Sequence, residues 1–147
     1  MKKLFLLPIF IIILFLPPGC SGVKTISLML NCDGDCNNTN AIVITVYQLK
    51  SADIFKSTSF ESLIRNPDEI LKTDLVPDSK FEKMLAPGDS LEIKDIEIKK
   101  DAKFLGVIGD FHSPAKDGWK QVVSLASGLD ELKIIVHKNS LTCISED

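Results

Sequence analysis

Residues 41–49 read AIVITVYQL. β-Branched and aromatic side chains dominate this stretch, and such side chains favour strands. Because successive side chains of a strand point to opposite faces, Ile42, Ile44 and Val46 share one face, and valine, threonine and tyrosine alternate on the other. The stretch predicts a β-strand, and it is the element around which we build the rest of the fold.

Six further stretches have the apolar alternation or β-branched content that predicts strands, and they are residues 24–31, 81–85, 91–98, 104–111, 132–137 and 141–145. The alternation slips between Ile93 and Ile96, which predicts a bulge or bend. Gly106 and Gly109 predict close packing or a bulge. The last two strands are expected to form a hairpin over residues 138–140.

Residues 57–65 have apolar side chains at spacings of three and four, and serine and threonine at their start are good N-caps, so this stretch predicts a helix. A second helical turn is expected over residues 68–75, after Pro67. We predict no strand in residues 112–131. About seven short strands predict an all-β fold, a two-sheet sandwich with one or two short helices.

The start of the chain has the layout of a secretory signal, with two lysines followed by an apolar run over residues 4–16. Gly19 before Cys20 resembles the lipobox of bacterial lipoproteins, although Pro17 and Pro18 depart from that pattern. The resemblance implies a cleaved signal peptide (1–19), a lipid on Cys20 and one lipid-anchored periplasmic β-sandwich domain (20–147). Ser21, by resemblance to lipoprotein sorting rules, favours the periplasmic face of the outer membrane. A signal cut elsewhere, leaving a free protein, is the alternative.

The charge of the mature chain argues against nucleic-acid binding. Removing two lysines leaves 15 basic residues against 20 acidic ones, a formal charge of -5. Such a chain repels phosphate-rich partners on average, and its basic residues are not interleaved with aromatic side chains.

Three cysteines follow Cys20, in a compartment where thiols oxidise. Cys32 and Cys36 are separated by only three residues, so a local disulfide is the simplest pairing. The alternative joins Cys143 to one of the two. Both pairings remain open on the sequence alone.

The local signatures of common enzymes are absent, since the sequence contains no HExxH, GxSxG or GxxxxGK motif. His112 and His137 are interpreted as surface or strand residues. We therefore expect no enzyme.

The loop after the first predicted strand has oxygen-bearing side chains at alternate positions, as at the start of a calcium loop: Asp33, Asp35, Asn37 and Thr39. Ile44 stands where such a loop needs its bidentate glutamate, so a plain protruding polar loop is favoured and no metal is predicted. A generic periplasmic lipoprotein that binds a small ligand or calcium is the alternative function.

An ordered set of motifs resembles TssJ, the outer-membrane lipoprotein family of type VI secretion systems. The set comprises VYQLK (46–50), then Phe55, Phe60, Leu63, Leu71, Asp74 and Leu75, then APGD (86–89), LGVIGDF (105–111), and Trp119 with Lys120. The departures are the loop cysteines, Thr45 in place of a basic residue, and a missing proline before VYQL.

The resemblance implies a transthyretin-like β-sandwich that binds the periplasmic C-terminal region of TssM, within a complex that includes TssL. It implies no reaction and no cofactor beyond the lipid. The family's contact loop maps to residues 31–40, and the candidate partner-binding residues are Asp33, Gly34, Asp35, Asn37 and Asn38. Phe111 and Trp119 are expected to pack in the core or at an edge.

Overall fold

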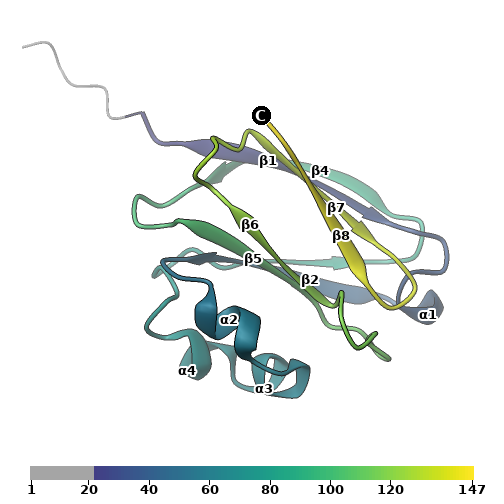
Figure 1. Cartoon of the computed structure of the whole chain (residues 1–147). Helices are drawn as coiled ribbons and strands as arrows, with labels where there is room; N and C mark the ends of the chain where they lie inside the picture. Colours follow the sequence, from purple (N-terminus) through teal and green to yellow (C-terminus); the bar gives the residue numbers. More distant parts are fainter. Residues whose placement is uncertain (1–21) are drawn as a thin grey trace, which may run out of the picture.

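The computed structural model describes residues 22–147, and the predicted signal peptide (1–19) and Cys20 lie outside this range. Two four-stranded sheets pack face to face, with strand orders β4-β1-β7-β8 and β3-β2-β5-β6 (Figure 1). The strands are β1 (Thr25–Cys32), β2 (Ile42–Leu49), β3 (Phe81–Leu85), β4 (Ser90–Glu97), β5 (Phe104–Gly109), β6 (Lys120–Ser124), β7 (Glu131–Val136) and β8 (Leu141–Glu146). The predicted all-β sandwich is confirmed.

Strand β2 has the central role that its sequence predicts. It pairs antiparallel with β3 on one side and β5 on the other, and Ile42, Ile44 and Val46 are buried between the sheets. Thr45 and Tyr47 on the opposite face are buried too. The helical segment α2 to α4 covers that face (Figure 1).

The predicted slip in β4 is a β-bulge. Ile26 of β1 pairs with Ile96, but Leu28, two residues on, pairs with Ile93. Strand β4 therefore contains one extra residue at this point, and Asp95 adopts a left-handed φ of 59°.

The two glycines of β5 mark close packing, as predicted. A Cβ on Gly106 would lie 2.8 Å from the Phe55 ring, and one on Gly109 would lie 2.6 Å from the Phe111 ring. A larger side chain at either position would displace an aromatic ring from the core.

Three short helices follow β2, where one or two were expected, and a further short turn, α1, lies in the first loop. Their bounds are α1 (Cys36–Thr39), α2 (Asp53–Ser57), α3 (Phe60–Arg65) and α4 (Pro67–Leu71). Ser59 caps α3, because its side chain accepts a hydrogen bond from the Ser62 amide. The capping prediction is right, but the helix begins three residues later than expected. None of the helices in residues 22–147 is long and apolar enough to cross a membrane.

Strand β6 was not predicted. It is an edge strand that pairs only with β5 in its sheet, and Val122 and Val123 are its two adjacent apolar residues. With so short an apolar stretch no alternation is visible, so the strand is stabilised by its pairing with β5 rather than by a pattern of its own.

Within residues 22–147, the buried apolar core extends from Ile26 to Leu141. It includes Phe111 and Trp119, as expected. A chain beginning after Cys20 therefore contains every core residue that the structure describes.

Candidate functional site

The loop between β1 and β2, residues 33–41, is closed at its base by a disulfide between Cys32 and Cys36, whose Cα atoms lie 5.6 Å apart. This is the local pairing, and Cys143 is a free thiol. Burial raises the pKa of the Cys143 thiol to about 12.

The second half of this loop turns back on the sandwich instead of protruding. Asn37, Asn38 and Thr39 have left-handed φ values of 48°, 52° and 64°. Asparagine tolerates this conformation better than most residues, whereas a β-branched threonine rarely adopts it. The expectation of a wholly protruding loop is therefore wrong, because these residues form a tight left-handed turn with Cys36 and Asn37 buried.

The side chain of Asn37 fastens this turn from the inside. Its Nδ2 donates to the Ala41 carbonyl at 2.8 Å, and its Oδ1 accepts from the His112 amide at 2.7 Å. The residue is only 3% exposed. Its backbone N–H donates to the His137 carbonyl at 3.1 Å. The side-chain amide of Asn37 is therefore hydrogen-bonded within the protein and almost fully buried.

The side chain of Asp33 contacts His137 at the β7–β8 hairpin. Its Oδ2 lies 2.7 Å from Nδ1 of His137, and Nε2 of the same ring lies 3.0 Å from Oγ1 of Thr142. A histidine donating through Nδ1 can accept the threonine hydroxyl through Nε2, so all three groups are satisfied. His137 therefore links the loop to the β7–β8 hairpin, beyond the surface role expected of it.

Backbone hydrogen bonds join two neighbouring segments to the loop and its base, and a third segment is joined through one of these two. The Cys32 amide donates to the Asp89 carbonyl at 2.8 Å, and the Asn38 amide donates to the Lys138 carbonyl at 3.1 Å. The hairpin is joined in turn to residues 112–118, because the Ala115 amide donates to the Asn139 carbonyl at 2.9 Å. We call this end of the sandwich, formed by residues 33–41, 86–89, 110–118 and 137–140, the loop end.

Asp33, Gly34 and Asp35 form the exposed tip of the loop, and Asn38 is half-buried beside it. A Cβ on Gly34 would meet no atom within 4 Å. The alternate oxygens considered for calcium do not converge, since Asn37 and Asp33 are engaged elsewhere. Among residues 22–147 no cluster of three His, Cys, Asp or Glu side chains has the geometry for a metal.

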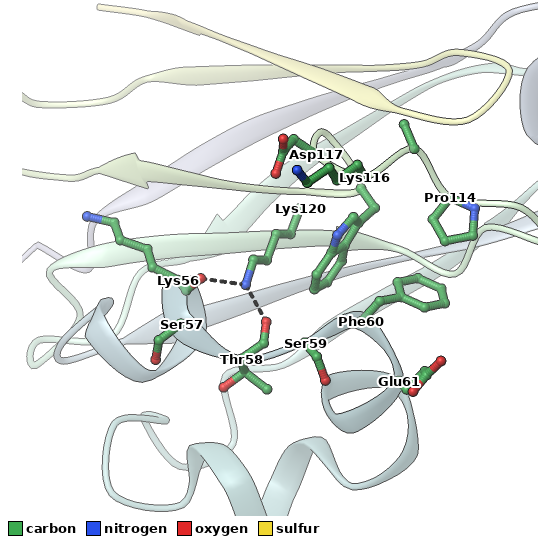
Figure 2. A pocket seen from close by; sticks show the side chains of 12 residues that line it. Lys56, Ser57, Thr58, Ser59, Phe60, Glu61, Pro114, Lys116, Asp117 and Lys120 are labelled. Carbon is green, nitrogen blue, oxygen red and sulfur yellow. Dashed lines mark hydrogen bonds between the residues drawn. The ribbon is translucent and has the colours of Figure 1, made fainter.

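A shallow groove of about 560 Å³ runs between the α2–α3 connection and residues 114–117 (Figure 2). Lys120 lies at its base, and its ammonium donates to the carbonyls of Phe55, Lys56 and Thr58 at 2.6, 2.8 and 2.6 Å. These carbonyls end α2, so Lys120 caps that helix. The ammonium also lies 4.6 Å from the Trp119 ring centre, and burial lowers its pKa. The Trp119-Lys120 pair fastens the helical segment to the sheet.

A small β-sandwich with an ordered loop at one end has the general arrangement of proteins that carry their binding residues on a loop. The chain belongs to the family whose model is described as "Type VI secretion lipoprotein, VasD, EvfM, TssJ, VC_A0113", which matches residues 24–139. The resemblance seen in the sequence is confirmed. The family consists of lipoproteins anchored to the outer membrane, as structural components of type VI secretion.

Solved structures agree with this assignment. The T6SS lipoprotein TssJ1 from Pseudomonas aeruginosa has the same fold, with a TM-score of 0.75 at 18% identity, covering 86% of this chain and 98% of that one. A chain of a structure described as "Type VI membrane complex" matches at TM-score 0.73 and 27% identity, covering 84% and 99%. A chain of a structure described as TssM C-terminal domain (869-1107) from EAEC matches at TM-score 0.70 and 25% identity, covering 83% and 98%. No curated protein sequence matches the chain.

Proposed function

We propose that this chain anchors a type VI secretion envelope complex to the periplasmic face of the outer membrane. It is acylated on Cys20, and its loop end binds the periplasmic C-terminal region of TssM, in a complex that includes TssL. The family membership supports the anchoring role. The likeness to a chain of a structure described as a type VI membrane complex, and to a chain of a structure described as the TssM C-terminal domain, supports the choice of partner.

The observation that carries the proposal is the path of β1. This strand begins at Thr25, five residues after the predicted lipid attachment, and ends at Cys32, where the loop starts. Eight residues of strand span about 23 Å, at roughly 3.3 Å per residue. The start of β1, which follows the predicted lipid attachment in the sequence, and the loop end therefore lie at opposite ends of the sandwich (Figure 1).

Binding requires no reaction. The loop tip offers two exposed carboxylates and an open glycine, and the turn behind it is already ordered by Asn37 and the disulfide. A pre-ordered loop loses little conformational entropy when it binds. We assign Asp33, Gly34, Asp35 and Asn38 to contact, and Asn37 to positioning the loop.

The test is capture of the periplasmic C-terminal region of TssM from detergent-solubilised membranes by the full-length lipoprotein. The Asp33→Asn/Asp35→Asn variant is expected to lose most of the captured TssM while keeping its melting temperature. The matched control is Asp101→Asn/Asp130→Asn, which removes two exposed carboxylates at the opposite end.

If both double variants captured equal amounts of TssM, the assignment of the loop to the interface would be wrong. A Cys20→Ser variant tests the lipid anchor separately from the loop. It is expected to lose membrane attachment while its loop remains intact. Failure to capture TssM with the unmodified lipoprotein would overturn the choice of partner.

A further inference from the structure

Five lysines gather at the end of the sandwich where β1 begins. Backbone hydrogen bonds bring their segments together, since the Ile98 amide donates to the Lys24 carbonyl at 2.8 Å and the Lys103 amide donates to the Leu49 carbonyl at 2.9 Å. We call these residues the lysine rim: Lys24, Lys50, Lys99, Lys100 and Lys103. Lys99 is half-buried and paired with Glu97 at 3.1 Å, and the other four are exposed.

The rim is positive on a chain that is negative as a whole. Residues 97–103 together with Lys24 and Lys50 contain five lysines and the acids Glu97 and Asp101, and counting the nearby Asp74 leaves 5 − 3 = +2. The formal charge of the full chain is -3. Four further acids at this end lie on the β7–β8 side, and they are Asp130, Glu131, Glu146 and Asp147, so the positive charge is confined to the rim.

Apolar surface accompanies the lysines. Val23 is 65% exposed immediately before Lys24. A shallow, mostly apolar depression is lined by Ala102, Phe104 and Leu125, and Lys103 lies at its border. Lysines around exposed apolar side chains are the combination found on proteins that rest on a bilayer surface, because the ammonium groups reach headgroups while apolar atoms enter the boundary.

The attachment point determines where this end of the domain lies. Cys20 precedes Thr25 by five residues, and a fully extended chain spans at most about 3.6 Å per residue, or roughly 18 Å. The lysine rim begins within that short tether, so it stays close to the membrane that holds the lipid. The attraction between surface lysines and anionic headgroups acts over about one Debye length, roughly 8 Å at physiological salt.

We propose that the lysine rim is a membrane-contact surface that binds the anionic phospholipid headgroups of the membrane carrying the anchor. The inference rests on the proposed acylation of Cys20. Contact through residues 97–103 turns the acidic β7–β8 side away from the bilayer and points the loop end away from it. The lipid then holds the domain, and the rim sets its orientation.

The test uses the mature chain without lipid, residues 21–147, which contains the whole core. Its co-flotation is measured with vesicles of phosphatidylcholine alone and of phosphatidylcholine with phosphatidylglycerol at a 7:3 ratio. Binding is expected only to the anionic vesicles, and it should weaken as salt is raised. Replacing Lys99, Lys100 and Lys103 by glutamine is expected to lower the partition coefficient by about fivefold per lysine removed.

The matched control is Lys83→Gln/Lys116→Gln/Lys138→Gln, which removes the same charge from exposed lysines outside the rim and is expected to bind nearly as well as the parent. Equal losses in the two triple variants, or equal binding to the two kinds of vesicle, would overturn the proposal. Because no lipid is attached in this assay, its outcome is independent of acylation at Cys20, and TssM capture reports on the proposed function separately.

Discussion

The Oδ2 atom of Asp33 lies 2.7 Å from Nδ1 of His137, although the two residues are 104 positions apart in the chain. The contact joins the tip of the loop after β1 to the start of the β7–β8 hairpin. Because the other ring nitrogen contacts Thr142, the imidazole cannot rotate without losing both partners. The hairpin therefore sets the position of the loop tip.

Replacing His137 by alanine is expected to loosen the loop without unfolding the protein. Both side chains of the pair are more than a third exposed, so the free energy of unfolding should fall by less than about 1 kcal/mol. Amide hydrogen exchange in residues 33–36 should become faster. His112→Ala is the control, because His112 hydrogen-bonds to the loop through its backbone amide, which the substitution keeps. Unchanged exchange in the His137 variant would show that the disulfide alone orders the tip.

Asn37→Ala is expected to cost about 2–3 kcal/mol of stability, because it removes two side-chain hydrogen bonds and leaves the His112 amide without its acceptor. Asn38→Ala is the matched control. Asn38 has a similar left-handed backbone, with a φ of 52°, so it has the same backbone cost of about 1 kcal/mol without losing those bonds. Urea unfolding of both variants measures the difference, and equal losses would contradict the positioning role of Asn37.

Gly34→Gln is expected to reduce TssM capture by at least about tenfold, or about 1.4 kcal/mol, while leaving the melting temperature unchanged. The backbone at Gly34 is not left-handed and its Cβ position is open, so the larger side chain projects from the tip without straining the fold. Ser127→Gln, at the opposite end, is the control for added bulk. Normal capture by the Gly34 variant would place the interface elsewhere.

Lys120→Met is expected to lower the free energy of unfolding by about 2 kcal/mol, because three carbonyls at the end of α2 lose their charged donor. The methionine side chain keeps most of the packing against Trp119, so the loss reports mainly on the hydrogen bonds. Lys116→Met, on the exposed side of the same groove, should change stability little. Thermal melts compare the two, and similar melting temperatures would mean that α2 needs no cap from the sheet.

Tyr47→Phe is expected to reduce the loss of stability at high pH. Burial, together with the nearby charges of Glu82 and Asp68, raises the pKa of Tyr47 from 10.0 to about 12. Between these values the unfolded chain has lost the phenolic proton while the folded chain keeps it, so the free energy of unfolding falls as pH rises. Relative to the parent, the variant should gain about 1–2 kcal/mol between pH 9 and pH 12 in urea unfolding. A constant difference across this range would contradict the assignment.

The sequence predicts the fold well where the side-chain period is unambiguous. Strand β2 and the bulge between Ile93 and Ile96 follow from alternation alone, because one face of each strand must be buried. Strand β6 does not, since Val122 and Val123 are adjacent and the strand forms by pairing with the edge of β5. Short elements stabilised by their neighbours carry little signal of their own.

The site is predicted in outline only. The turn-forming residues of 31–40 identify a loop, and the close cysteines suggest its disulfide. The inward role of Asn37 depends on Ala41 and on the distant His112 and His137. The cap that Lys120 provides likewise depends on carbonyls more than 60 positions earlier in the chain. Contacts of this kind have no periodicity by which a sequence could reveal them.

Strand β1 has one consequence for mechanical load. If the lipid and the partner were pulled apart, the force would act on the domain at Thr25 and at Cys32. These residues are the two ends of a single strand, so the force would act along the axis of that strand. That strand is internal to its sheet, paired antiparallel with β4 and parallel with β7. Its hydrogen bonds lie across the direction of pull, so they share the force in shear rather than opening one after another. The sandwich should therefore resist force best along the axis of β1, which is the direction from the lipid anchor to the partner bound at the loop end.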